Sequence, residues 1–292
     1  MSHILSPELL RRPVHVLVVG CGGNGSAIAA GLPYLHQAML VHGHQGGLDV
    51  TLMDGDVVSA TNCVRQPFSQ AEIGHSKAVV LVSRMNLFWG LDWHAVPEHF
   101  CSGTSVDRVD ILIGCVDTRV ARRVIAEKVT GRSSVFLWLD LGNHATGGQF
   151  VLGQPWNWRN KRSATRLRTV AELFPELVEP SLDDDGQPSC SAVEALERQS
   201  PFVNPTLANH ALALLERLFR QGSVGYHGAF VNVAEGRVQP MAVNPKLWRG
   251  MRRRGQRHWR GEQGGCGLGW QAQAPKTFIG GYGVEADSPG GS

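Results

Sequence analysis

The chain has 292 residues, of which 42% are hydrophobic and 18% are charged, so its composition predicts a well-buried globular core. The formal net charge of +3 is too small to indicate a nucleic-acid partner, and no apolar run approaches the length of a membrane span. The N-terminus lacks the apolar stretch of a signal peptide, and the six scattered cysteines form no CxxC pair. We therefore expect a cytoplasmic protein without a structural zinc site, a membrane partner or a nucleic-acid partner.

Residues 14–25, VHVLVVGCGGNG, are the stretch around which the rest of the chain is organised. The aliphatic residues 14–19 predict a buried strand, and the glycine-rich turn after them predicts a helix packed close to the sheet. Glycines let a ligand approach the backbone, and a helix start offers N–H groups and a positive dipole end to a phosphate. The turn therefore predicts a nucleotide site. Its GxGxxG pattern, Gly20, Gly22 and Gly25, also occurs in dehydrogenases and methyltransferases, so it does not identify the nucleotide.

Apolar runs and helical patterns alternate as far as residue 152. A helix is expected from the glycine turn to about Leu40, and further helices at 77–87 and 118–128. Further strands are expected at 49–53, 93–96, 110–114, 135–141 and 150–152. This alternation predicts a doubly wound, Rossmann-like α/β fold with a mostly parallel sheet and helices on both faces. Ligands of such sheets bind at the carboxyl ends of the strands, where the glycine turn, Asp54 and residues 115–117 would converge.

The remaining sequence is predicted to complete one domain and to end in a tail. Residues 154–190 have the composition of a long crossing loop with one short helix at 169–173, and loops of such length are usually functional. An amphipathic helix at 205–221 and a hairpin formed by 229–233 and 238–243 follow. We expect one domain over residues 1–244 and a disordered tail over 245–292, which is first basic and then rich in glycine.

A second polar stretch, MDGDVVSATNCVRQPFSQAEIGHSKA at residues 53–78, separates two classes of nucleotide enzyme. Asp54 follows the second strand, where an acid can bind a ribose in dehydrogenases and in ATP enzymes alike. Arg65 and Lys77 favour ATP, because a triphosphate needs fixed cations, whereas a nicotinamide site needs at most one arginine for a 2′-phosphate. Asp117 ends a later apolar strand, where it could hold Mg²⁺ between phosphate oxygens, cap the helix at Thr118, or do both.

Four segments in order resemble the ThiF/MoeB/HesA adenylating family, which includes the ubiquitin-activating enzymes. They are GCGGNG, MDGDVVSATNCVRQ, GHSKA and GCVDTRVAR, and the resemblance spans residues 14–152. Within the family, the chain is most similar to the ThiF-family proteins of PRTRC systems. The resemblance implies an ATP-binding adenylation domain over residues 1–244, ATP and Mg²⁺ as cofactors, and a homodimer. The reaction implied is attack by the C-terminal glycine carboxylate of a ubiquitin-like or sulfur-carrier protein on the α-phosphate of ATP, giving an acyl adenylate and pyrophosphate.

The resemblance also implies a role for each matching residue. Asp54 would bind the ribose hydroxyls, Arg65 and Lys77 the phosphates, and Asp117 the magnesium ion. Catalysis by Arg65, Lys77 and Asp117 would rest on positioning and electrostatics. Further nucleotide-binding residues would be Gly20, Gly22, Gly23, Gly25, Asp56, Asn62 and Gln66, with the glycines lining the phosphates and Asp56 and Asn62 beside the α-phosphate.

Cys190 is a second candidate for chemistry, because it matches by resemblance the cysteine that accepts the activated acyl group in sulfur-carrier members. A free cysteine is also often a small buried residue, so a structural role stays open. Many members supply an arginine from the N-terminal helix of the dimer partner, and either Arg11 or Arg12 could provide it.

Two other functions stay open. The glycine turn and Asp54 are also compatible with an NAD(P)-binding Rossmann oxidoreductase, against which Arg65 and Lys77 argue. A catalytically silent family member would bind ATP without forming pyrophosphate, for example because the partner's arginine is missing.

Overall fold

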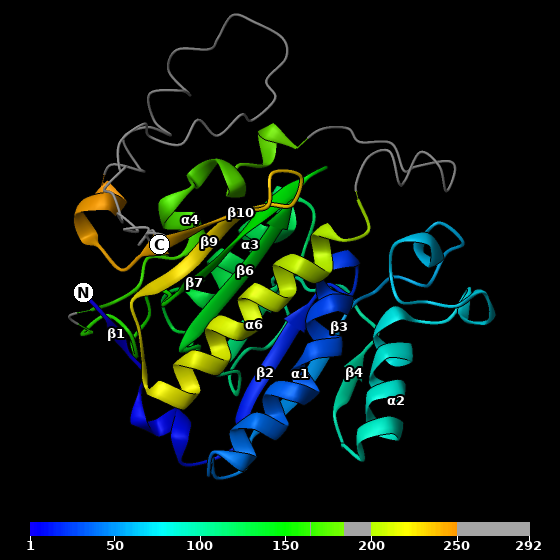
Figure 1. Ribbon diagram of the computed structural model, residues 1–292, viewed down its shortest axis with the longest axis horizontal. Coiled ribbons are helices and arrows are strands. Elements are labelled where there is room, and N and C mark those ends of the chain that lie inside the picture. Colours follow the sequence, from blue (N-terminus) through cyan, green and yellow to red (C-terminus); the bar gives the residue numbers. More distant parts are fainter. Residues whose placement is uncertain (164, 184–199, 250–292) are drawn as a thin grey trace, which may run out of the picture.

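The computed structural model describes residues 1–163, 165–183 and 200–249, and a mixed eight-stranded sheet runs through this part of the chain (Figure 1). In spatial order, its strands are β10 (Arg237–Ala242), β9 (Tyr226–Asn232), β7 (Gly147–Gly153), β6 (Leu137–Asn143), β5 (Ile111–Gly114), β2 (Val14–Val19), β3 (Leu48–Met53) and β4 (His94–Val96). The five strands from β6 to β4 are parallel, and β7, β9 and β10 extend the sheet with antiparallel pairs. The sheet is therefore mostly parallel where the glycine turn leaves it.

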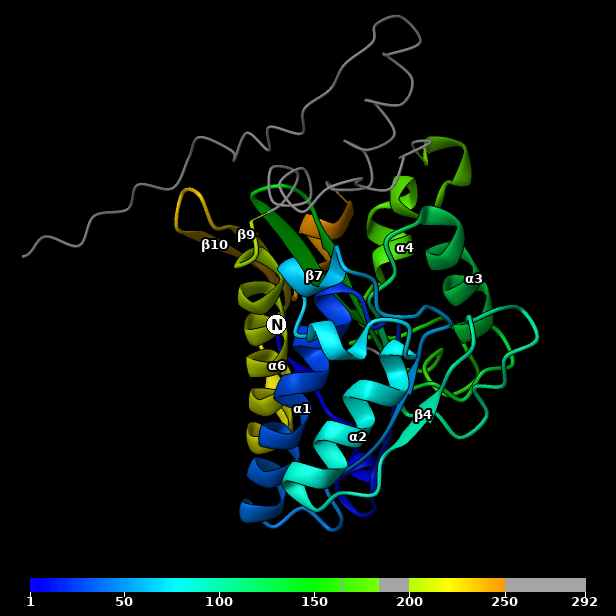
Figure 2. The ribbon, with the colours of Figure 1, turned by 90° about the vertical axis from the view of Figure 1, so that its right-hand side faces the viewer.

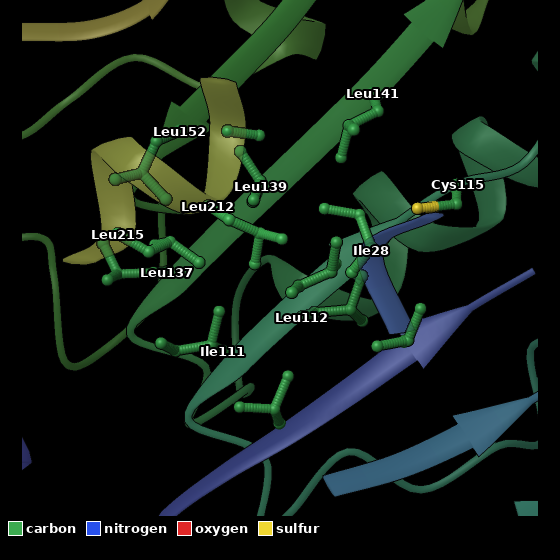
Figure 3. Packing of buried hydrophobic residues seen from close by; sticks show 14 of the residues in the cluster. Ile28, Ile111, Leu112, Cys115, Leu137, Leu139, Leu141, Leu152, Leu212 and Leu215 are labelled. Atoms are coloured by element: carbon green, nitrogen blue, oxygen red, sulfur yellow. The ribbon is translucent and has the colours of Figure 1, made fainter. Parts of the chain in front are cut away.

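The central strands are apolar on both sides because helices cover both faces. Val16 of β2 lies opposite Val50 of β3 and Ile111 of β5, and all three side chains are buried. Continuous aliphatic runs of this kind are typical of parallel strands that are covered on both faces. Figure 3 shows this core, in which Leu139 of β6 lies near Leu212 of a covering helix.

Two long helices, α1 (Gly23–Val41) and α6 (Val203–Gln221), lie side by side on one face of the sheet (Figures 1 and 2). Helix α2 (Lys77–Trp89) lies beside α1, whereas α3 (Arg119–Val129) covers the opposite face. The crossing loop contains α4 (Val170–Leu173) and two 3₁₀ helices, η4 (Pro175–Val178) and η5 (Pro180–Leu182). In the described ranges, no helix has both the length and the apolar composition needed to cross a membrane.

The predicted fold class is confirmed, because strands and helices alternate in the expected order and the hairpin β9–β10 continues the sheet through β7. The strands β1 (His3–Ile4) and β8 (Ser223–Val224), which pair with each other, were not predicted. A single 3₁₀ turn, η1 (Pro7–Leu10), precedes β2 and begins after Ser6. Strands of two residues leave no periodic pattern in a sequence, so only the pairing itself reveals them.

The folded part extends beyond the expected boundary at residue 244. Residues 245–249 are helical, and Trp248 is buried with its ring centroid 5.1 Å from that of His227. The basic composition concealed this contact, because one large aromatic side chain can anchor a segment whose other residues remain exposed. Residues 250–292 of the expected tail lie outside the described residues.

Candidate nucleotide-binding site

A cavity of about 880 Å³ opens at the carboxyl ends of β2, β3, β5 and β6. The predicted site residues converge on it from distant parts of the sequence, since Asp54 and Asp56 follow β3 and Asp117 follows β5. Those that line the cavity are Gly20, Gly22, Gly23, Asp54, Asp56, Asn62, Arg65, Gln66, Lys77 and Asp117. The cavity volume falls within the range expected for small-molecule and cofactor sites.

The glycine turn is shaped by close backbone contacts. Gly20 has φ = +91°, and a Cβ atom there would lie 2.9 Å from the Cys115 carbonyl oxygen. Gly25 does not line the cavity, which differs from the expectation that it would line the phosphates. A Cβ atom on Gly25 would lie 1.8 Å from the Gly20 carbonyl oxygen, so this glycine is required for helix α1 to start directly against the strand.

The start of α1 is suited to a phosphate. Its N-cap, Gly22, provides no capping side chain, and the first turn contains no acidic residue. The first N–H groups of a helix have no partner within the helix, and its N-terminus carries a positive partial charge. An anion in the cavity can therefore satisfy these groups.

Asp54 holds this turn against the following loop. Its carboxylate accepts hydrogen bonds from the backbone N–H groups of Cys21 and Asp56, the second at 2.7 Å. Asp54 is buried, while each carboxylate oxygen keeps a further lone pair for a ligand hydroxyl. The sequence indicated a ribose ligand here but not this positioning contact. The neighbouring Cys21 is unsuited to nucleophilic chemistry, because burial raises the pKa of its thiol.

Lys77 is the buried cation of the site. It is the first residue of α2, its side chain is 8% exposed, and its Nζ lies 2.9 Å from Oδ2 of Asp56. The Asp56 side chain is 56% exposed, so the pair combines a buried ammonium group with a carboxylate that reaches solvent. His99 approaches the same carboxylate, with its Nε2 4.0 Å from Oδ1 of Asp56.

The segment after β3 lines the cavity beside this pair. It contains η2 (Asn62–Val64), and Oδ1 of Asn62 accepts a hydrogen bond from the Ser59 N–H at 3.0 Å. Arg65 is half-buried and also lines the cavity. Oε1 of Gln66 is buried and has no hydrogen-bond partner among the described residues. The segment therefore places the guanidinium group of Arg65 and an amide oxygen of Gln66, left unbonded by the other described residues, along one wall of the cavity.

Asp117 is exposed and does not cap α3, which overturns that alternative. Oγ of Thr118 accepts the capping hydrogen bond from Ala121 N at 3.2 Å. Asp183, at the end of η5, accepts from the N–H groups of Arg119 and Val120 at 2.8 and 3.1 Å. Because the helix start is already satisfied, the carboxylate of Asp117 stays unengaged by the other described residues and lines the cavity. No three His, Cys, Asp or Glu side chains in the described ranges are grouped to hold a metal ion.

The two arginines considered for a partner's site lie far from the cavity of their own chain. Arg12 precedes β2, at the amino ends of the strands, and its guanidinium donates to both carboxylate oxygens of Asp110 at 2.7 and 2.8 Å. These contacts raise the pKa of Arg12 and hold it within its own chain. Arg11 is exposed. Cys190 lies outside the described residues.

Three asparagines at the cavity wall were missed by the sequence reasoning. Asn24, Asn143 and Asn204 line the cavity and are joined by hydrogen bonds, although they come from α1, β6 and α6. Asn24 was visible as the polar residue of the glycine turn, and Asn143 as a polar residue at a strand end. Nothing local in the sequence shows that Asn204 joins them.

The described residues form a Rossmann-like α/β fold with a cavity at the carboxyl ends of its parallel strands. A sequence model of the ThiF family matches residues 8–139, slightly less than half of the chain. The narrower similarity to PRTRC proteins stays a prediction. No curated protein sequence matches the chain.

Solved structures of low sequence identity share the fold. PaaA has 15% identity and a TM-score of 0.51, with 79% of this chain and 64% of PaaA covered. MccB from E. coli with ATP has 15% identity and a TM-score of 0.50, with 81% of this chain and 65% of MccB covered. The chain thus spans slightly less than two thirds of the length of these proteins.

Proposed function

We propose that this protein uses ATP to adenylate the C-terminal carboxylate of a carrier protein or peptide. The observation that carries the proposal is the buried Lys77, which lines one cavity together with the glycine turn, Arg65 and Asp117. A lysine side chain is seldom so buried without a compensating anion. Its partner Asp56 is largely exposed to solvent, so the positive charge of Lys77 remains available to a phosphate. The match of residues 8–139 to the ThiF family model and the similarity in fold to MccB with ATP support the same nucleotide.

In the proposed reaction, a carboxylate oxygen of the substrate attacks the α-phosphorus of ATP. The bond from this phosphorus to the oxygen of the departing pyrophosphate breaks, and the products are an acyl adenylate and pyrophosphate. Negative charge accumulates on the leaving group, where Lys77 and Arg65 would stabilise it. Asp54 would bind the ribose while it holds the glycine turn in place, and the start of α1 would hold a phosphate.

Asp117 is the proposed magnesium ligand. Mg²⁺ in ATP sites commonly takes one or two protein carboxylates and completes its shell with phosphate oxygens and water. An exposed carboxylate at the cavity wall that no other described residue engages fits this requirement. When bound, the ion would neutralise part of the phosphate charge.

The narrower parts of the proposal concern the substrate and the later steps. We propose a ubiquitin-like or sulfur-carrier protein ending in glycine as the substrate, a homodimer, and Cys190 as an acceptor of the acyl group. Asp183 and Ser200, the described residues on either side of the segment that contains Cys190, bond to the start of α3 and to Ala145. Thr118, directly before the start of α3, and Asn143, two residues before Ala145, both line the cavity.

Isotope exchange tests the reaction. With Mg²⁺ and a glycine-terminated ubiquitin-like protein, the wild type should transfer labelled pyrophosphate into ATP, and Asp117→Ala should lose this activity while remaining folded. ATP binding without exchange for any such carrier would indicate a silent binding module. Tight binding of NAD without binding of ATP, measured by calorimetry, would indicate the oxidoreductase instead.

A further inference from the structure

The three cavity asparagines form a connected chain of amides. Nδ2 of Asn24 donates to Oδ1 of Asn143 at 3.1 Å, and Nδ2 of Asn143 donates to Oδ1 of Asn204 at 2.9 Å. Asn24 and Asn204 are 6% and 1% exposed, whereas Asn143 is exposed. Two buried side chains therefore fix the orientation of one that a ligand can reach.

The arrangement is costly for the protein alone. Oδ1 of Asn24 is buried and has no hydrogen-bond partner among the described residues. A buried, unsatisfied acceptor costs about 1–3 kcal/mol. Gly23 also has to be a glycine for Asn204 to reach the cluster, because a Cβ atom there would lie 2.1 Å from Nδ2 of Asn204. These costs indicate that the cluster is held for a ligand contact rather than for stability.

The hydrogen-bond donor and acceptor that the other described residues leave unused on the Asn143 side chain define what it can bind. One lone pair of its Oδ1 accepts from Asn24 and one N–H of its Nδ2 donates to Asn204, which leaves one acceptor site and one donor. A peptide group offers one N–H donor and one C=O acceptor. A simple carboxylate offers acceptors alone, so it would use only half of this capacity.

The place of the cluster in the sheet separates it from the nucleotide residues. Asn143 ends β6, whereas Asp54 follows β3, and the order β6-β5-β2-β3 puts three strand spacings between them. At about 4.8 Å per spacing, the two ends of the cavity are about 14 Å apart along this edge. A nucleotide held over β3 and β2 would therefore leave the β6 end to a second molecule.

We propose that Asn143, held between Asn24 and Asn204, binds the last peptide group of the polypeptide substrate, directly before the reacting carboxylate. This inference rests on the proposed adenylation. The cluster is uncharged, so it orients the acyl end without an ion pair that would weaken the attacking carboxylate. Asn143 is the contacting residue, and Asn24 and Asn204 are positioning residues.

Stable analogues of the acyl adenylate test the contact by calorimetry. One probe is 5′-O-(N-acetylglycylsulfamoyl)adenosine, whose acyl part contains one peptide group, and the second is 5′-O-(N-acetylsulfamoyl)adenosine, which has none. The wild type should bind the first about tenfold more tightly than the second, the effect of one or two net hydrogen bonds. Asn143→Ala should abolish this preference and leave the Kd of AMP unchanged.

Matched variants distinguish loss of the Asn143 contact from a non-specific effect of replacing an asparagine. Asn232→Ala alters an asparagine at the end of β9 that lies outside the cavity lining, and it should keep the full preference. Asn24→Ala should reduce the preference without affecting AMP. The peptide-group site would be overturned, and the proposed function left standing, by either of two results. The first is an Asn143→Ala variant that still prefers the analogue with a peptide group, and the second is a wild type that binds AMP but shows no such preference. A wild type that binds neither AMP nor ATP would instead overturn the proposed function on which the site rests.

Discussion

Replacing Asp54 by alanine should destabilise the whole fold and not only the ligand site. The carboxylate accepts from the N–H groups of Cys21 and Asp56, and a hydrogen bond to a charged group contributes about 1.5–3 kcal/mol. Asp56 is largely exposed, so water can replace its bond, whereas Cys21 is fully buried and its N–H would remain unpaired. We therefore expect Asp54→Ala to lower the free energy of unfolding by about 3 kcal/mol.

Denaturant unfolding followed by circular dichroism measures this change, and calorimetry on the folded variant measures ATP binding. Asp49→Ala is the matched control, because Asp49 lies in β3 and its side chain pairs, within the described part of the chain, with the half-exposed ring of His15. It should change stability by less than about 1 kcal/mol. ATP affinity should fall at least tenfold in Asp54→Ala alone. A loss of stability no larger than that of the control, or unchanged ATP binding, would refute the assigned role of Asp54.

Three further predictions concern the packing of the site and of the C-terminal segment. Gly25→Ala should abolish ATP binding and lower the melting temperature, because its Cβ would lie 1.8 Å from the Gly20 carbonyl oxygen. Gly225→Ala is the control, because its Cβ would meet no neighbour within 4 Å, and it should keep ATP binding. A Gly25→Ala variant that binds ATP normally would contradict the close contact. Burial lowers the pKa of His227 to about 4, so the unfolded chain takes up a proton on this ring at a higher pH than the folded protein does. The free energy of unfolding should therefore be unaffected by this group above pH 6.5 and fall by up to about 3 kcal/mol as the pH decreases towards 4. A His227→Gln variant with the same pH dependence would contradict this cause. Trp248→Ala should lower the free energy of unfolding by about 3 kcal/mol, and a change as small as that of the exposed Leu247→Ala would show that residues 245–249 add nothing to the fold.

The parts of the fold that the sequence could predict are those whose causes are local. The aliphatic run of β2 and the glycines after it lie next to each other in the chain, so strand, turn and helix follow from twelve consecutive residues. The rule that ligands bind at the carboxyl ends of parallel strands then brought Asp54 and Asp117 to one edge. Both line the cavity, as do Arg65 and Lys77.

The parts that could not be predicted depend on contacts between distant residues. Asp183 satisfies the start of α3 from 64 positions away, and this contact excludes Asp117 from the capping role that its place before Thr118 suggested. Arg12 is held by Asp110 across 98 positions, which no local pattern announces. The amide chain from Asn24 to Asn204 likewise exists only once α1, β6 and α6 have packed together.

The fate of one oxygen atom tests the central claim most directly. A glycine-terminated ubiquitin-like protein labelled with ¹⁸O in its C-terminal carboxylate is incubated with ATP, Mg²⁺ and the wild type, and hydroxylamine removes the acyl group. If the carboxylate attacks the α-phosphorus, the AMP released must carry the heavy oxygen, because the bond from that oxygen to phosphorus remains intact when the acyl group leaves. Mass spectrometry should therefore detect labelled AMP together with pyrophosphate. Unlabelled AMP, or ADP and phosphate in its place, would contradict adenylation.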